Sequence, residues 1–243
     1  MVIFKLNVNS RTNARVKKYL KNKFGERTLK ICIDGHFTCP NRDGSVGKTG
    51  CIFCSERGSG EHIKCPNIAD SIISIKEQVK NYFSSYKSAR ANKFIAYFQN
   101  FTNTYDSVSN LKAKYDAALI DDRIVGLSIA TRPDCINEEI VKLLHSYSKK
   151  YYVFVELGLQ TSNDETGKII SRGYLSKTFT NAVSILNKYN IDVVCHIMVG
   201  LPNENFDDIK NTVDFLNMHS IQGIKIHSTY IVKNTILANM YNE

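Results

Sequence analysis

Six short apolar segments alternate along the chain with amphipathic segments, and this alternation constrains the fold more than any other feature. The apolar segments are residues 29–33, 93–98, 124–129, 151–157, 191–199 and 223–227. Most are near-continuous apolar runs, as expected of parallel strands that are buried on both faces. Five segments between them carry apolar residues at helical spacing, and Ser74 with Glu77 has the pattern of a capping box at the start of the first. Strict alternation predicts an α/β fold with a parallel sheet, either doubly wound or curled towards a barrel.

Three cysteines, Cys39, Cys51 and Cys54, lie in one glycine-rich loop directly after the first predicted strand. In either architecture ligands bind at the carboxyl ends of the strands, and this loop lies at that edge. Thiolates are the soft ligands that zinc, copper(I) and iron–sulfur clusters prefer. Such sites normally take four protein ligands, so three cysteines leave one coordination position without an evident protein ligand. An open position is typical of a catalytic metal site.

Two simpler interpretations of the loop stay open. Cys51 and Cys54 could form a dithiol, or a structural zinc site could be completed by His36, His62 or Cys65. The number of protein ligands distinguishes a closed structural site from a catalytic one.

Composition indicates an ordinary globular protein. The 243 residues, 43% of them apolar, suffice for one barrel-sized domain or two small ones. No apolar stretch is long enough for a membrane span, and the amino terminus lacks the apolar core of a signal peptide. Seven cysteines, an odd number in metal-type spacings, favour a reducing compartment over a disulfide framework. We therefore expect a cytoplasmic protein with no membrane partner, whereas oligomeric state has no signal in the sequence.

The net charge is +9, and much of it lies in residues 11–30. The basic residues there are Arg11, Arg15, Lys17, Lys18, Lys21, Lys23, Arg27 and Lys30. Such an excess attracts polyanions, and RNA is the natural partner for a cytoplasmic enzyme. A solvated lysine-rich face is the alternative. We divide the chain into a basic extension, residues 1–25, and the region of alternating strands and helices, residues 26–243.

Several motifs together resemble one known family. They are the three cysteines after the first strand and residues 34–43, 50–54, 97–105, 128–134, 156–160 and 200–202. This combination resembles the radical S-adenosylmethionine (SAM) superfamily, and more narrowly its YhcC/YtqA branch, which is related to the Elp3 radical SAM domain. The resemblance runs from about residue 30 to the end of the chain and implies a parallel (β/α)6 partial TIM barrel. Relatives continue beyond the sixth strand, so we expect that this chain lacks a C-terminal element.

The resemblance also implies the cofactors. A [4Fe–4S] cluster would be held by Cys39, Cys51 and Cys54, and SAM would chelate the fourth iron. One-electron reduction, from a donor such as flavodoxin or ferredoxin, would cleave SAM to methionine and a 5′-deoxyadenosyl radical that abstracts hydrogen from the substrate. The cofactor would thus occupy the open coordination position.

Five further residues become candidate SAM contacts by the same resemblance. Gln160 would bind the ribose and Arg172 the methionine carboxylate, although a surface cation at a helix start is the alternative for Arg172. Phe53 would pack beside the adenine or the cluster, or is a core aromatic. Gln99 stands where many relatives have glycines that receive the methionine amino group. His196 stands where some relatives carry a ribose-binding Asp, but we favour a hydrogen-bonded core histidine.

The YtqA-like branch is associated with tRNA wobble uridines, in which the carboxymethylaminomethyl group at C5 becomes aminomethyl. A wobble base is accessible because it is an unpaired loop nucleotide. Two other functions stay open: a radical SAM enzyme acting on a small metabolite or peptide, and a zinc-stabilised RNA-binding module. No residue is assigned to substrate catalysis.

Overall fold

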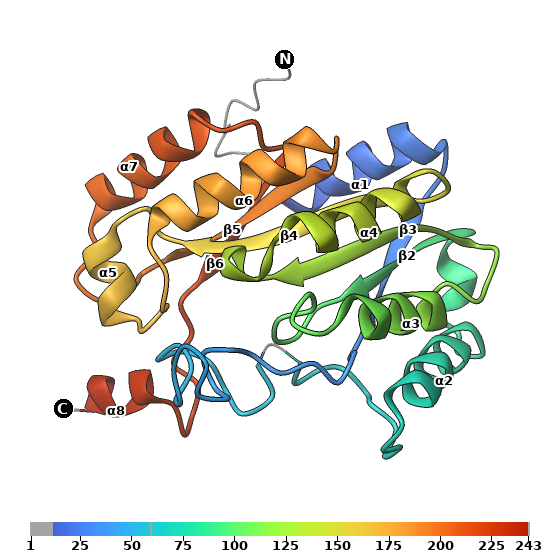
Figure 1. The fold of residues 1–243 in the computed structure, drawn as a ribbon, viewed down its shortest axis with the longest axis horizontal. Helices are drawn as coiled ribbons and strands as arrows, with labels where there is room; N and C mark the ends of the chain where they lie inside the picture. The colour runs from blue at the N-terminus through green and yellow to red at the C-terminus, as the bar shows by residue number, and fades with distance from the viewer. Residues whose placement is uncertain (1–11, 59, 243) are drawn as a thin grey trace.

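The computed structural model describes residues 12–58 and 60–242, and its centre is one six-stranded parallel sheet (Figure 1). The strands follow in chain order β1 (Thr28–Ile33), β2 (Lys93–Phe98), β3 (Ile124–Thr131), β4 (Tyr152–Gln160), β5 (Asp192–Val199) and β6 (Gly223–Ser228). All five neighbouring pairs are parallel, so every carboxyl end lies at the same edge. The sheet is curled, which confirms the predicted (β/α)6 partial barrel.

Helices occupy every crossover between strands. They are α2 (Ser71–Phe83), α3 (Val108–Ala118), α4 (Glu138–Ser148), α5 (Asp164–Ile169), α6 (Ser176–Lys188) and α7 (Phe206–Asn217), with short 3₁₀ turns at Ser88–Arg90 and Pro133–Cys135. Figure 1 shows α3, α4 and α6 side by side over one face of the sheet. The short α5 adds one helix to the five that the apolar spacing predicts.

The predicted capping box at the start of α2 is wrong. The helix begins at Ser71, because the Asp70 side chain accepts hydrogen bonds from the backbone N–H groups of Ile72 and Ile73. Ser74 is instead buried within the helix, where its hydroxyl lies 2.8 Å from His36 Nε2.

The two faces of the sheet differ in what they bury. The outer face packs against the helices in one large apolar core that includes Ile31, Phe98 and Leu127. At the amino-terminal end of the inner face, a smaller cluster joins Ile95 and Phe154 to Leu20. The curled sheet therefore has an apolar inner floor at the end opposite its carboxyl edge.

Leu20 belongs to α1 (Thr12–Phe24), which is the described part of the basic extension. The helix packs on the barrel through Leu20, which is 6% exposed, and through a hydrogen bond of 3.0 Å between Tyr19 and Tyr152 hydroxyls. Its four lysines, Lys17, Lys18, Lys21 and Lys23, are exposed, whereas Arg11 and the side chain of Arg15 lie outside the described residues. Because α1 covers the amino-terminal end of the strands, its basic surface does not line the carboxyl edge (Figure 1).

The last helix, α8 (Ile236–Asn242), lies beside the cysteine loop. The backbone N–H of Leu237 donates to the Ile52 carbonyl at 3.0 Å, and both side chains belong to one apolar cluster. Among the described helices, none is long and apolar enough to cross a membrane.

We predict that Leu20→Ala lowers the free energy of unfolding by about 2–5 kcal/mol, because it empties a buried position between α1 and the sheet. Urea denaturation measures the change. Val16→Ala on the same helix is the matched control, since Val16 is 56% exposed, and it should change stability by less than about 0.5 kcal/mol. Equal effects of the two substitutions would contradict the packing of α1.

Candidate active site

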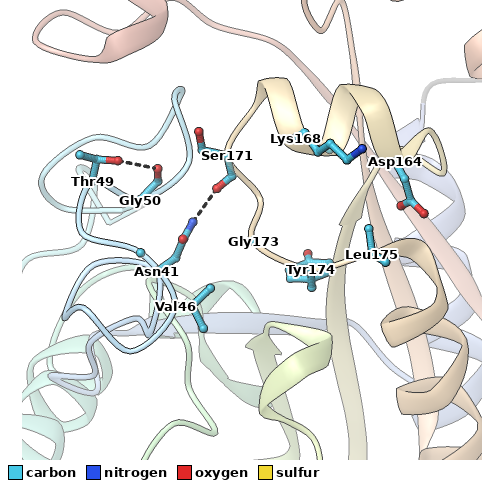
Figure 2. Close-up of a pocket in the computed structure, with 12 residues that line it drawn as sticks. Asn41, Val46, Thr49, Gly50, Asp164, Lys168, Ser171, Gly173, Tyr174 and Leu175 are labelled. Carbon is cyan, nitrogen blue, oxygen red and sulfur yellow. Dashed lines mark hydrogen bonds between the residues drawn. The ribbon is translucent and has the colours of Figure 1, made fainter.

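The cysteine loop is folded by its own backbone and hydrogen-bonded to the segment directly after α5, in the crossover that follows β4. The Asn41 carbonyl accepts a hydrogen bond of 2.7 Å from Gly50 N–H, and the turn at Gly50 requires a positive φ of 76°. The Asn41 side-chain amide donates to the Ser171 carbonyl at 2.7 Å, as Figure 2 shows. The Ile52 N–H donates to the Ile170 carbonyl at 3.1 Å. The loop is therefore held at the carboxyl edge of the sheet, as predicted.

The three thiols of the loop are free and partly shielded from solvent. Burial, together with the neighbouring Cys54 thiol, raises the pKa of Cys51 to about 11, although Arg132 opposes the shift. Burial also raises the pKa of Cys54, against the opposing charge of Arg42. The Asn41 amide N–H approaches Cys51 Sγ at 3.6 Å. Thiols that burial and mutual repulsion keep protonated become strong ligands once a cationic centre replaces their protons.

This donor set fits an iron–sulfur cluster that has one position open to a further ligand. Three soft sulfur donors come from one loop, and an amide N–H points at one of them. Across residues 12–58 and 60–242, no three His, Cys, Asp or Glu side chains are placed to hold a single metal ion. His36 and Cys65, considered above as zinc ligands, contact each other at 3.3 Å beside α2.

Unpaired polar atoms collect at the carboxyl end of β2. Asn100 Oδ1, Thr102 Oγ1 and Asn103 Oδ1 are buried and have no hydrogen-bond partner among the residues that the structure describes. The Thr102 N–H donates to the Thr38 carbonyl at 3.2 Å, so this segment lies against the start of the cysteine loop. Buried polar atoms are normally paired, and a group of unpaired ones is typical of a ligand site. Gln99, half-buried, immediately precedes them.

The end of β4 places Gln160 in an unusual backbone conformation. Its φ is +68°, and the register with β5 shifts between Gly158 and Gln160. A Cβ on Gly158 would come within 2.9 Å of Gln160 Nε2, so the glycine leaves room for this side chain to lie over the strand end. Gln160 is half-buried at the carboxyl edge, where the sequence predicts a SAM contact.

Arg172 is fully buried, so the alternative interpretation of a surface cation is wrong. Its guanidinium donates to the carbonyls of Leu159 at 2.8 Å, Thr161 at 2.6 Å and Tyr174 at 2.9 Å, and to Asp164 Oδ1 at 2.8 Å. Four of five donors are therefore used within the protein. A two-bond pairing with the SAM carboxylate would require one of these hydrogen bonds to break.

A neighbouring arginine supports the same region. Arg132 forms a two-bond ion pair with Asp134, at 2.9 and 2.6 Å, and donates to the Arg172 carbonyl at 3.0 Å. The ends of β3 and β4 are thus tied together through two arginines.

Phe53 is half-buried against an apolar cluster that contains Ile52, Ile170 and Leu237.

A cleft lies beside the cysteine loop (Figure 2). Asn41 and Val46 line it from the loop, and Asp164, Lys168 and Tyr174 line it from the segment after β4. None of the cysteines and none of the predicted SAM contacts is among its lining residues.

Sequence reasoning missed a network of polar side chains inside the barrel, centred on Glu156 of β4. Each of the six strands contributes to it, and β6 contributes two members: Lys30, Tyr97, Ser128, Glu156, His196, Lys225 and His227. The carboxylate is only 1% exposed. Burial alone would raise the pKa of Glu156, but the charge of Lys30, the hydrogen bond from His196 and the charge of Lys225 hold it well below its usual range. The signal was present in the sequence as charged residues within otherwise apolar strands.

His196 lies within this network and is hydrogen-bonded, in agreement with our favoured interpretation of this residue. Its Nε2 is 2.6 Å from Glu156 Oε2, and its Nδ1 is 3.3 Å from His227 Nε2. Burial lowers the pKa of His196, and burial followed by the charges of His196 and Lys225 lowers the pKa of His227 to about 4. Lys30, which we counted with the basic surface, points into the barrel and forms an ion pair with Glu156.

The comparisons with known proteins agree with this geometry. The model of the radical SAM superfamily matches residues 39–216. The chain therefore belongs to the radical SAM superfamily, whose members use a [4Fe–4S] cluster and SAM.

Among individual relatives, the chain is similar to two proteins of the YhcC/YtqA type. It is 39% identical to the uncharacterized protein YtqA of Bacillus subtilis (strain 168), over 93% of this chain and 69% of YtqA. It is 34% identical to YhcC of Escherichia coli (strain K12), over 91% of this chain and 70% of YhcC. These similarities confirm the narrower resemblance to this branch.

The chain is also similar, at lower coverage or lower identity, to proteins whose names state an activity or a family. A tRNA uridine(34) acetyltransferase of Dehalococcoides mccartyi is 31% identical over 50% of this chain and 26% of its own length. The structure of Methanocaldococcus infernus Elp3 superimposes with a TM-score of 0.61 at 16% identity, over 88% of this chain. This chain spans only 49% of that Elp3 chain, and the likeness shows a shared fold.

We predict that Arg172→Lys lowers the free energy of unfolding by about 3–5 kcal/mol, because the hydrogen bonds of a buried guanidinium to Asp164 and to three backbone carbonyls are broken. Urea denaturation measures this effect. Arg27→Lys, at an exposed position, is the matched control and should change stability by less than about 0.5 kcal/mol. If Arg172 served only as a SAM ligand, Arg172→Lys would weaken SAM binding and leave stability unchanged.

We also predict that the His227 imidazole titrates near pH 4 in the folded protein, well below the usual value of about 6.5. The unfolded chain then binds more protons between these values, so stability should be lost as the pH falls from about 6.5 towards 4. Nuclear magnetic resonance of the labelled imidazole measures the pKa directly. His227→Gln should make the pH dependence of the urea midpoint shallower; an imidazole that titrates above pH 6 would contradict the buried arrangement.

Proposed function

We propose that this radical SAM protein acts on tRNA and converts the carboxymethylaminomethyl group of a wobble uridine to aminomethyl. One observation carries the catalytic part of the proposal. The loop with Cys39, Cys51 and Cys54 is held at the carboxyl edge of the sheet, beside a group of buried polar atoms that have no hydrogen-bond partner in the described part of the chain.

The chain's own residues divide into ligands and supports. Cys39, Cys51 and Cys54 would hold the cluster through their thiolates, leaving one iron for SAM. When bound, the cluster and SAM supply hydrogen-atom abstraction through a 5′-deoxyadenosyl radical. The unpaired oxygens of Asn100 and Asn103 suit the amino group of the SAM methionine, because both are hydrogen-bond acceptors.

The remaining predicted contacts receive different roles. Gln160, at the end of β4, would bind the SAM ribose, with Gln99 and Phe53 bordering the same edge of the sheet. Arg172 would act as a positioning residue, because its hydrogen bonds fix the backbone between Leu159 and Tyr174. His196 would act from within the barrel network rather than as a ribose ligand.

Two observations support tRNA as the substrate. The net charge of +9 favours a polyanionic partner. A protein named as a tRNA uridine(34) acetyltransferase is similar over half of this chain. The lysines of α1 are exposed at the opposite end of the barrel, so they would contact a part of the tRNA remote from the modified base. We place the protein in the cytoplasm, with a flavodoxin or ferredoxin as electron donor.

Anaerobic reconstitution tests the catalytic part. We predict about four irons and four sulfides per chain, and 5′-deoxyadenosine release from SAM after reduction. Single substitutions Cys39→Ala, Cys51→Ala and Cys54→Ala should abolish the release, whereas Cys195→Ala, a buried core cysteine, should retain it. A colourless protein that binds zinc and leaves SAM intact would overturn the proposal.

The substrate is tested separately, in a strain from which the gene has been deleted. Its tRNA should accumulate carboxymethylaminomethyluridine at the wobble position and lose the aminomethyl form. An unchanged wobble-uridine profile, together with SAM cleavage by the pure protein, would point to a small metabolite or peptide as the substrate.

A further inference from the structure

The barrel network carries an excess of positive charge. It contains the ammonium groups of Lys30 and Lys225 and the single carboxylate of Glu156. His196 and His227 add no charge near neutral pH, since burial lowers the pKa of both. One positive charge is therefore left without a counter-charge from the network.

The part of the network that an entering ligand would meet is cationic. The Glu156 side chain is 1% exposed, whereas those of Lys30 and Lys225 are 27% and 39% exposed. These lysines lie on β1 and β6, the two edges of the open sheet. A partly buried charge is costly unless an opposite charge pairs with it.

Lys225 is the lysine better placed to bind a ligand. Lys30 makes the closer ion pair with Glu156, whereas Lys225 Nζ is 3.5 Å from Glu156 Oε2 and 3.1 Å from the Tyr97 hydroxyl. An ammonium group has three donors, so at least one N–H of Lys225 remains for another acceptor.

The hydrogen bond between His196 and His227 makes Nδ1 of His227 a hydrogen-bond acceptor on β6, the strand that also carries Lys225. Because Glu156 is ionised, His196 Nε2 donates to it, and the neutral ring then accepts at Nδ1. His227 Nε2 must donate to that Nδ1, which leaves His227 Nδ1 as an acceptor. No partner of His227 Nδ1 is found in the described part of the chain. Lys225 and His227 are two residues apart in β6, so their side chains lie on the same face.

We propose that Lys225 binds a carboxylate of the substrate and that His227 Nδ1 accepts a hydrogen bond from a neighbouring N–H of the same molecule. The pair thus recognises an N-substituted amino acid. The inference rests on the proposed function only where it names the molecule that carries these two groups. The carboxymethylaminomethyl group of the proposed substrate combines a carboxylate with an amine. The SAM methionine carries the same two groups and is the alternative source that the experiment must separate.

The experiment follows the ¹⁵N-labelled imidazole resonances of His196 and His227 in the cluster-loaded protein. N-methylglycine should shift these resonances saturably. N-methylglycinamide, in which an uncharged amide replaces the carboxylate, should not. Lys225→Gln, which removes the charge and keeps hydrogen-bonding capacity, should weaken N-methylglycine binding about 10-fold or more. Lys225→Arg should retain binding, as should Lys210→Met, which removes an exposed lysine of α7.

Three results would overturn the inference: no saturable shift with N-methylglycine, equal shifts with the amide, or unchanged affinity in Lys225→Gln. A fourth is that SAM alone gives the same shifts and blocks N-methylglycine, because the carboxylate would then be that of the cofactor. Comparing the two ligands on the unsubstituted protein keeps the test valid if a variant fails to fold. Binding of N-methylglycine with unchanged wobble uridines in the deletion strain would refute the tRNA substrate alone.

Discussion

The carboxylate of Glu156 is the constraint on which the shape of the barrel depends. In a flat sheet, β1 would lie three strand spacings from β4, roughly 14 Å away. Lys30 of β1 and Lys225 of β6 nevertheless both reach Glu156 on β4, and Tyr97 and Ser128 reach it from the strands between. The sheet must curl for these contacts to form. Removing the carboxylate would leave two ammonium groups facing each other inside the barrel, which is strongly unfavourable.

The curl also brings the carboxyl ends of the strands together around one site. The cysteine loop after β1 is bonded to Ser171 beyond β4, and Arg172 next to it fixes the carbonyls of Leu159 and Thr161. Arg132, from the end of β3, donates to the Arg172 carbonyl. The loop, the β3 end and the β4 end therefore form one connected framework. A substitution of Arg172 is thus expected to alter the position of the thiols, although Arg172 does not contact them directly.

Much of the fold could be predicted from the sequence, because buried parallel strands and amphipathic helices have distinct apolar patterns. The cysteine loop could be predicted for the same reason, since its place after β1 defines its edge of the sheet. Curvature was predicted only through the family resemblance, as no periodicity encodes it. Lys30 was therefore assigned to the surface, although the curl directs it to Glu156. The start of α2 was misplaced because a local capping pattern at Ser74 competed with Asp70, which is the cap in the folded chain.

The most direct test of the account is Mössbauer spectroscopy of the ⁵⁷Fe-reconstituted protein with and without SAM. Three cysteine ligands predict that SAM changes the signal of one iron in four and leaves three unchanged. The central claim is that this loop keeps one coordination position open for SAM. It would be contradicted if SAM left the Mössbauer signals of all four irons unchanged, or if the protein assembled no cluster with its three loop cysteines intact.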